Sequence, residues 1–157
     1  MIDYFDETSR CLMTFQFIEE VLKQNLIRLN VLTYFCIKKY VPYDLKPNLH
    51  SINNAAMGRL VEMYKIYCDD ADLISDLRKI KDHRDNIAHK GFLLTVEEQH
   101  DKENIKLEIS KLKEINEFAK KRMYKLMKSW EDLEAILNQI AAEQRSRTEG
   151  EESPTPD

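Results

Sequence analysis

The sequence predicts an all-α protein, an antiparallel four-helix bundle that ends in a disordered C-terminal tail. Charged residues make up 33% of the 157 residues, with only 3 glycines and 4 prolines. That composition favours helices joined by short loops over a turn-rich β fold. Several stretches also repeat apolar residues at spacings of three and four, so each helix has one apolar face to place in a shared core.

The first helix is expected to begin at a cap supplied by Thr8 or Ser9 and to run to about Lys39. Pro42 and Pro47 then end it and mark a loop. Its apolar stripe comprises Leu12, Phe15, Ile18, Val21 or Leu22, Leu26, Leu29 and Leu32.

A second helix is expected after Ser51, Asn53 or Asn54, any of which can cap it. Gly58 lies inside this helix and costs about 1 kcal/mol of helix propensity relative to alanine. We expect a close approach to another helix to compensate. The apolar positions of this helix are Met57, Leu60, Val61 and Tyr64, with Tyr67 as a further candidate.

The third helix follows the acidic run 69–72, which suits the positive end of a helix dipole. Its stripe comprises Leu73, Leu77, Ile80 and Ile87. His89, Lys90 and Gly91 predict its end, since a basic turn followed by glycine is typical of a helix C-terminus. A loop from Gly91 to about Asp101 follows.

The last helix is long and keeps its three-four spacing from Ile105 to Ile140. After Gln144 the chain is polar, charged and proline-containing, so no core can form there. Residues 1–142 are therefore interpreted as one domain and residues 143–157 as a disordered tail.

Arg84 stands where the third helix stripe calls for an apolar residue, since 80, 84 and 87 continue the four-three rhythm. A buried arginine needs a partner. Asp85, Asn86 and His89 share one helix face by their spacings of four and three. Arg84 and His89, however, point about 140° apart on one helix. To serve one site together, they need a helix break near His89 or a second copy of the chain.

Positive charge for a polyanion is local, because the net charge is −4. Lys90 lies beside His89, and Lys121, Lys125 and Lys128 share one face of the last helix. These four lysines are the candidate phosphate contacts. The alternative for the last helix is a solvated face in which Glu117 pairs with Lys121.

Neither a cofactor nor a metal site is predicted. The chain lacks the glycine-rich nucleotide-binding motifs and the nucleophile elbow of hydrolases. Its histidines form no H-x-x-x-H pair, and the one E-x-x-H, beginning at Glu97, has no second copy.

The location expected from the sequence is cytoplasmic. Cys11, Cys36 and Cys68 lack C-x-x-C spacing and are interpreted as reduced thiols. The acidic N-terminus does not resemble a signal peptide, and no apolar run approaches the ~18 residues of a membrane span.

The segment Arg84-Asp-Asn-Ile-Ala-His89 near the end of a third helix resembles the motif of HEPN domains, R-x(4 to 6)-H in a four-helix bundle. The resemblance covers roughly residues 8–142. It implies a homodimer whose two motifs line one cleft, and a metal-independent endoribonuclease that uses the 2′-hydroxyl of RNA as nucleophile. It also implies bacterial defence, as a toxin-antitoxin or antiviral protein with a partner such as an antitoxin.

The resemblance suggests a role for each residue of the motif. His89 would transfer protons and Arg84 would bind phosphate oxygens as negative charge builds. Asp85 would orient the imidazole, and Asn86 would bind the ring or a phosphate. HEPN toxins modified by a nucleotidyltransferase often carry tyrosine two residues after the histidine, where this chain has Gly91. That regulation is therefore not expected.

Two other interpretations stay open at this stage. Arg84 can bridge helices by pairing with an acidic residue while His89 caps the helix C-terminus. The chain can also be a non-catalytic HEPN-like module for dimerisation or protein binding.

Overall fold

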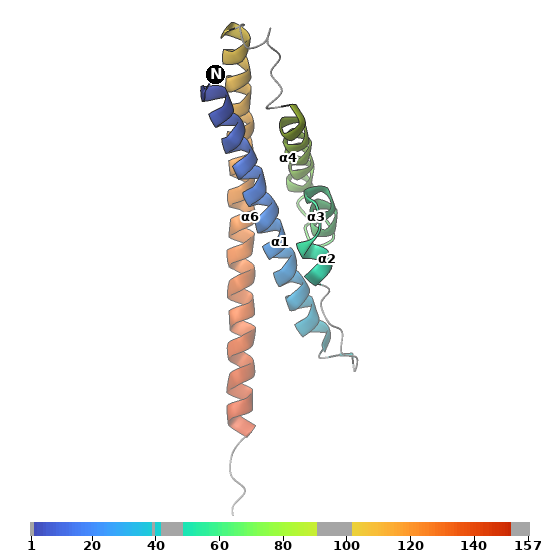
Figure 1. The fold of residues 1–157 in the computed structure, drawn as a ribbon. Helices are drawn as coiled ribbons and strands as arrows, with labels where there is room; N and C mark the ends of the chain where they lie inside the picture. Colours follow the sequence, from blue (N-terminus) through green and yellow to red (C-terminus); the bar gives the residue numbers. More distant parts are fainter. Residues whose placement is uncertain (1, 39, 42–48, 91–101, 152–157) are drawn as a thin grey trace, which may run out of the picture.

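In the computed structural model, the described residues are 2–38, 40–41, 49–90 and 102–151, and their secondary structure is entirely helical. The all-α prediction is confirmed. The described helices are α1 (Ile2–Lys38), α2 (Leu49–Asn53), α3 (Met57–Tyr64), α4 (Ala71–Lys90) and α6 (Lys102–Glu151) (Figure 1).

The two longest helices, α1 and α6, run in the same direction (Figure 1). The Cys11 thiol donates to the carbonyl of Leu112 at 3.2 Å, and the Asn25 amide donates to the carbonyl of Leu126 at 3.0 Å. Both pairs are 101 residues apart in sequence. A constant offset at two levels is possible only when the helices are parallel.

Helix α4 runs antiparallel to this pair. Asp70, before the start of α4, pairs with Lys125, whereas Asp76, further along α4, pairs with Arg122, which is earlier in α6. The predicted antiparallel relation therefore holds for α4 against α6 and not for α1 against α6. A short loop between two helices forces them to be antiparallel, but no such loop joins α1 to α6. Side-chain packing therefore sets the relative direction of these two helices.

A seven-residue repeat explains the parallel pairing. Buried side chains recur at every seventh position of both helices, and the offset of 101 pairs each one with its counterpart. A seven-residue repeat keeps the same seam of each helix facing its partner, as in coiled coils. The repeat positions are Tyr4, Cys11, Ile18 and Asn25 in α1 and Ile105, Leu112, Ala119 and Leu126 in α6.

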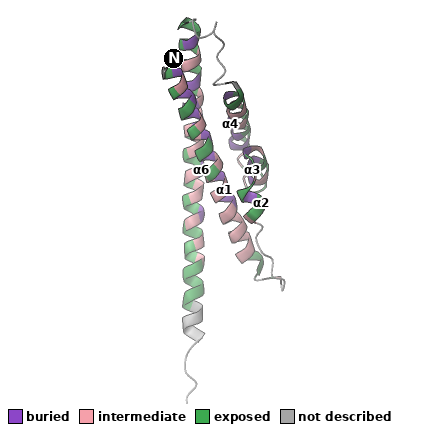
Figure 2. Cartoon of the chain, in the orientation of Figure 1, coloured by how far each residue is buried: buried purple, intermediate pink, exposed green. Residues whose placement is uncertain are grey.

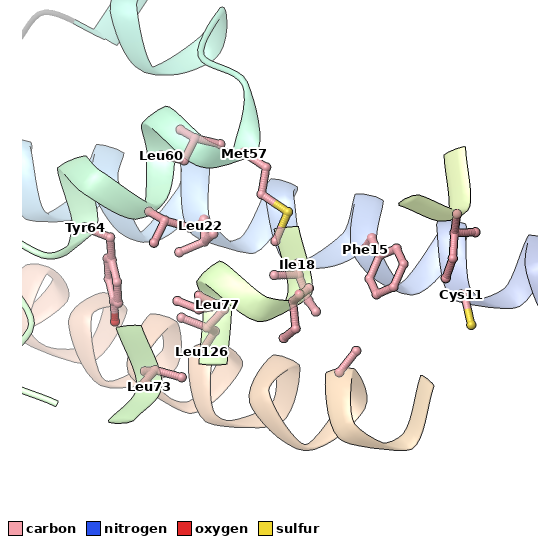
Figure 3. Packing of buried hydrophobic residues seen from close by; sticks show 14 of the residues in the cluster. Cys11, Phe15, Ile18, Leu22, Met57, Leu60, Tyr64, Leu73, Leu77 and Leu126 are labelled. Carbon is pink, nitrogen blue, oxygen red and sulfur yellow. The ribbon is translucent and has the colours of Figure 1, made fainter. Parts of the chain in front are cut away.

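Helices α3 and α4 cover one side of this pair and complete the core. Figure 3 shows Leu77 of α4 close to Leu22 of α1 and Leu126 of α6, and all three side chains are fully buried. Met57 and Leu60 of α3 add to the same cluster. The C-terminal part of α6 extends beyond α1 and is mostly exposed (Figure 2).

The predicted cap of the first helix is wrong, because α1 begins at Ile2. Thr8 and Ser9 lie inside the helix, and the buried Thr8 hydroxyl donates to the carbonyl of Tyr4 at 2.9 Å. The early start follows from packing, since the apolar seam extends back to Tyr4, which is 7% exposed. Helix α1 ends at Lys38, close to the predicted end.

The predicted second helix is divided into α2 and α3. Ser51 and Asn53 lie within α2, Asn54 follows it, and Ala56 occupies the α3 N-cap without a side-chain hydrogen bond. None of the three predicted caps is therefore used for α3. A close helix approach does not explain Gly58 either, because an added Cβ would meet only the flexible end of Lys81 at 3.8 Å.

The boundaries of α4 agree with the sequence, and those of α6 differ at one end. The Asp70 carboxylate accepts a hydrogen bond from the Leu73 amide at 2.8 Å, as expected for an acidic cap. Helix α6 continues to Glu151, past the predicted start of the tail at residue 143. The described side chains there, from 143 to 146, are exposed and contribute no core. The predicted loop 91–101 and residues 152–157 lie outside the described residues.

Asn25 gives a direct test of the α1–α6 register. Replacing Asn25 with Asp keeps the shape but removes the donor to the Leu126 carbonyl and buries a negative charge at a fully buried position. We expect Asn25→Asp to lower the free energy of unfolding by about 3 kcal/mol or more in urea denaturation at neutral pH. Asn138→Asp, at an exposed position of α6, is the control, with a change within about 0.5 kcal/mol. Equal stabilities for the two variants would contradict this packing.

The buried Cys11 thiol predicts that the stability of the fold decreases at alkaline pH. Burial raises the pKa of its thiol from 9.0 to about 11, with a smaller contribution from Glu7. Because the pKa of this thiol is higher in the folded than in the unfolded state, its contribution to the free energy of unfolding is complete below pH 9. That contribution is lost as the pH rises towards 11. In alkylation at pH 8 we expect the exposed Cys36 to react and Cys11 to react only after unfolding. Labelling of Cys11 at the rate of Cys36 in folded protein would be the opposite result.

Candidate functional site

The Arg84 to His89 segment lies in one continuous helix, because α4 runs unbroken to Lys90. Ile87 is 8% exposed and belongs to the core, which fixes the rotation of the helix. With that rotation, Arg84 and His89 leave the helix about 140° apart. The helix break that the sequence left open is absent, so one chain does not direct both side chains to one point.

Arg84 faces α1, where Glu19 is its partner. One guanidinium nitrogen lies 3.5 Å from Glu19 Oε2, and the two side chains are 35% and 18% exposed. The other carboxylate oxygen of Glu19 accepts a hydrogen bond from Lys23 at 3.2 Å. The Arg84 contact exceeds the 2.7–3.2 Å usual for N–H···O bonds. It is therefore an electrostatic contact between helices that leaves several guanidinium donors uncommitted.

Asp85 is engaged away from His89. Its carboxylate lies 3.0 Å from Lys81 and 3.4 Å from Arg84. The hydrogen bond from Lys81, with smaller contributions from the charges of Lys81 and Arg84, lowers the pKa of Asp85. The predicted contact of Asp85 with the imidazole is not among the interactions of the described residues. Asn86 and His89 are both exposed, and neither makes a side-chain hydrogen bond within the described part of the chain.

The predicted phosphate-binding lysines are divided among different surroundings. Lys125 pairs with Asp70, and this pairing raises the pKa of Lys125. Lys121 and Lys128 are exposed and form no ion pair with any described residue. The alternative pairing of Lys121 with Glu117 is not formed, because Glu117 binds Lys120 at 2.8 Å.

Lys125 does not lie beside the motif. Asp70, which holds Lys125, precedes His89 by a length of α4 that corresponds to about 28 Å. Lys90 is the last residue of α4, and its side chain lies outside the described residues. The structure thus brings Arg84 and Asp85 together and leaves Lys125 near the other end of α4.

A hollow of about 280 Å³ between α3 and α4 touches the charged network through Lys81. It is lined by Gly58, Val61, Glu62, Arg78, Lys81 and Asp82. Its charges largely cancel, since Arg78 binds Glu62 at 2.7 Å and Lys81 binds Asp82 at 3.3 Å. It is not a strongly positive pocket for phosphate.

Sequence reasoning missed Glu19 and Lys81. Glu19 has a recognisable signal, because Phe15, Glu19 and Leu22 continue a four-three spacing on α1. An acid on the flank of one stripe and a base in the stripe of another are a candidate pair. Lys81 is four residues before Asp85, which is the ordinary spacing of a helical ion pair.

Within the described residues, no group of three or more His, Cys, Asp or Glu side chains is placed to hold a metal ion. Nor does any described helix combine the length and apolarity needed to cross a bilayer. Comparison of the chain with protein families, with curated proteins and with solved structures finds no match in any of the three.

The strength of the Arg84–Glu19 contact can be measured with a double-mutant cycle of Arg84→Ala and Glu19→Ala. Because the pair is long and partly solvated, we expect a coupling free energy of at most about 1 kcal/mol. The Arg122–Asp76 pair is the comparison, since Arg122 donates two hydrogen bonds to Asp76 at 2.8 and 2.6 Å. Its coupling should be larger. A coupling of several kcal/mol for Arg84 and Glu19 would instead mark Arg84 as a structural residue.

Proposed function

We propose that the chain is a homodimeric, metal-independent endoribonuclease of the HEPN type. In this proposal α2 and α3 together take the place of the second helix of a HEPN-like four-helix bundle. One observation carries it. Arg84 and His89 both reach solvent from one unbroken helix but diverge, so they can act at one phosphate only if two chains contribute them.

The residue chemistry supports cleavage by internal transfer. Histidine removes the proton from the RNA 2′-hydroxyl, and the oxygen attacks the adjacent phosphorus. The 5′-oxygen leaves with a proton supplied by an acid, which gives a 2′,3′-cyclic phosphate. Arg84 binds the phosphate oxygens as negative charge builds. Each step uses side chains of the two motifs and requires no metal.

The charged network supports a positioning role for its acids. Glu19 and Asp85 contact different nitrogens of the Arg84 guanidinium, at 3.5 and 3.4 Å. These contacts favour one orientation of the side chain, which then loses less rotational freedom when it binds phosphate. Asp85 is assigned here to Arg84 and not to His89, and Asn86 remains available to RNA.

RNA contacts are proposed for Lys90, Lys121 and Lys128. The last two are exposed and unpaired within the described chain. Lys125 would first have to release Asp70. Cleavage of cellular or viral RNA fits a toxin-antitoxin or antiviral setting, in which a partner protein restrains the enzyme.

A non-catalytic helical interaction module is the second candidate. The Arg84–Glu19 ion pair also favours this candidate, since it links α4 to α1 as a structural bridge would. This candidate predicts no cleavage and a complex that survives loss of His89.

The two candidates are separated by an RNA cleavage assay in EDTA. We expect wild-type protein to cut RNA, and Arg84→Ala and His89→Ala to lose about 100-fold or more in rate. Arg78→Ala and His83→Ala are matched controls on the same helix and should cut like wild type. Intact RNA with wild-type protein, or equal cleavage by all variants, would reject the nuclease.

A mixing experiment tests the shared site. Arg84→Ala protein mixed and exchanged with His89→Ala protein forms dimers in which one site contains both native residues. Random exchange should restore roughly a quarter of the wild-type rate, because half of the dimers are mixed and each keeps one of the two Arg84–His89 pairs. No recovery in a mixture shown to contain mixed dimers would place Arg84 and His89 of one chain in the same site.

A further inference from the structure

The outer face of α1 has a symmetric pattern that the core does not require. Six residues at spacings of four and three lie within about 40° of the direction opposite Phe15, which is fully buried. Met13 and Phe17 in the middle are 68% and 55% exposed, unusually high values for large apolar side chains. The six residues are Asp6, Arg10, Met13, Phe17, Glu20 and Gln24. We call them the α1 outer stripe.

A shallow apolar hollow adjoins this stripe on the side of α6. It has a volume of about 230 Å³ and is lined by Phe17, Glu20, Val21, Gln24, Met127 and Trp130. Trp130, which lines it, also carries the Arg28 guanidinium 4.8 Å from its ring centroid. Protruding and hollow apolar surface therefore lie next to each other on one face.

The stripe is self-complementary about position 15. Met13 and Phe17 are equally far from that position, and so are Arg10 and Glu20. When a second α1 lies antiparallel on the first, a two-fold axis at position 15 sets Met13 against Phe17 of the other copy. The same axis brings Arg10 to the level of Glu20 of the other copy, although the two positions leave α1 about 80° apart. An interface of this kind is isologous, because each copy offers the same surface.

The charges that would meet are accessible. The Arg10 side chain is 65% exposed and binds Glu7 through one guanidinium nitrogen at 3.1 Å. Glu20 is exposed and accepts a hydrogen bond from Gln24 at 2.8 Å. Charge favours the reversed arrangement, because a parallel arrangement at the same level would bring Arg10 level with Arg10 and Glu20 level with Glu20.

We propose that the α1 outer stripe binds a second copy of the chain, antiparallel and centred on position 15. Opposite charges flank a central apolar contact, and the stripe extends about 27 Å along α1. Apolar anchors surrounded by charged pairs are the usual arrangement of a specific interface.

This interface is separate from the proposed ribonuclease site. Glu19, which contacts Arg84, points about 160° away from Phe17 around α1. The stripe therefore leaves α4 free, and its test does not depend on the nuclease proposal.

The test is the molar mass of the full chain by light scattering and sedimentation equilibrium. We expect Phe17→Glu to halve the mass of the wild-type assembly while the helical circular dichroism spectrum stays the same. Ile66→Glu is the matched control, because Ile66 is 79% exposed but lies outside the stripe, and it should keep the wild-type mass. A monomeric wild-type chain, or an unchanged mass for Phe17→Glu, would overturn the proposal.

Charge exchange tests the register. Arg10→Glu and Glu20→Arg should each weaken the association, since each sets like charges against each other. The double variant Arg10→Glu with Glu20→Arg should restore the wild-type mass. Loss of association in the double variant equal to that in the single variants would overturn the antiparallel pairing. RNA cleavage should be unchanged in Phe17→Glu, so failure of the nuclease and failure of this interface give different results.

Discussion

The parallel packing of α1 on α6 is the constraint on which the rest of the structure depends. Apolar side chains fill most of its seven-residue layers, and two buried polar groups bind across it to backbone carbonyls at the same offset. Apolar layers tolerate slippage by one repeat, whereas a buried amide that needs its acceptor does not. Asn25 also leaves its Oδ1 buried without a hydrogen-bond partner. We interpret this as a cost in stability that accompanies a fixed register.

The register in turn decides where the motif lies. Leu77 and Ile80 of α4 are fully buried and Ile87 nearly so, which fixes α4 both along and around its axis. Arg84 then meets Glu19 on α1, and His89 faces solvent at the end of the helix. The same packing turns Met13 and Phe17 outward. The divergence of Arg84 from His89 and the exposure of Met13 and Phe17 thus follow from one arrangement of helices.

The sequence was sufficient for the class of fold and for much of the core. Stripe residues such as Phe15, Ile18 and Leu77 are buried as their spacing indicates. The sequence could not predict the direction of α1 relative to α6, because helical spacing shows which face of a helix is buried. It does not show which other helix covers that face. The predicted cap at Thr8 or Ser9 was wrong, because α1 begins earlier, at Ile2, where tertiary packing overrides local capping preferences. For the site, the need of Arg84 for a partner was predictable, but Glu19 became evident only once α1 and α4 were placed together.

The most direct test of this account is the distance between paired spin labels on α1 and α6, with the three native cysteines replaced by alanine. One pair replaces Asp3 and Asn104, and the other replaces Glu20 and Lys121, so both pairs have the observed offset of 101 residues. Parallel packing predicts that both distances lie below about 25 Å, given axes that are 8–10 Å apart and the length of the labels. If one distance is short and the other is about 50 Å, α1 and α6 are antiparallel, and the account is contradicted.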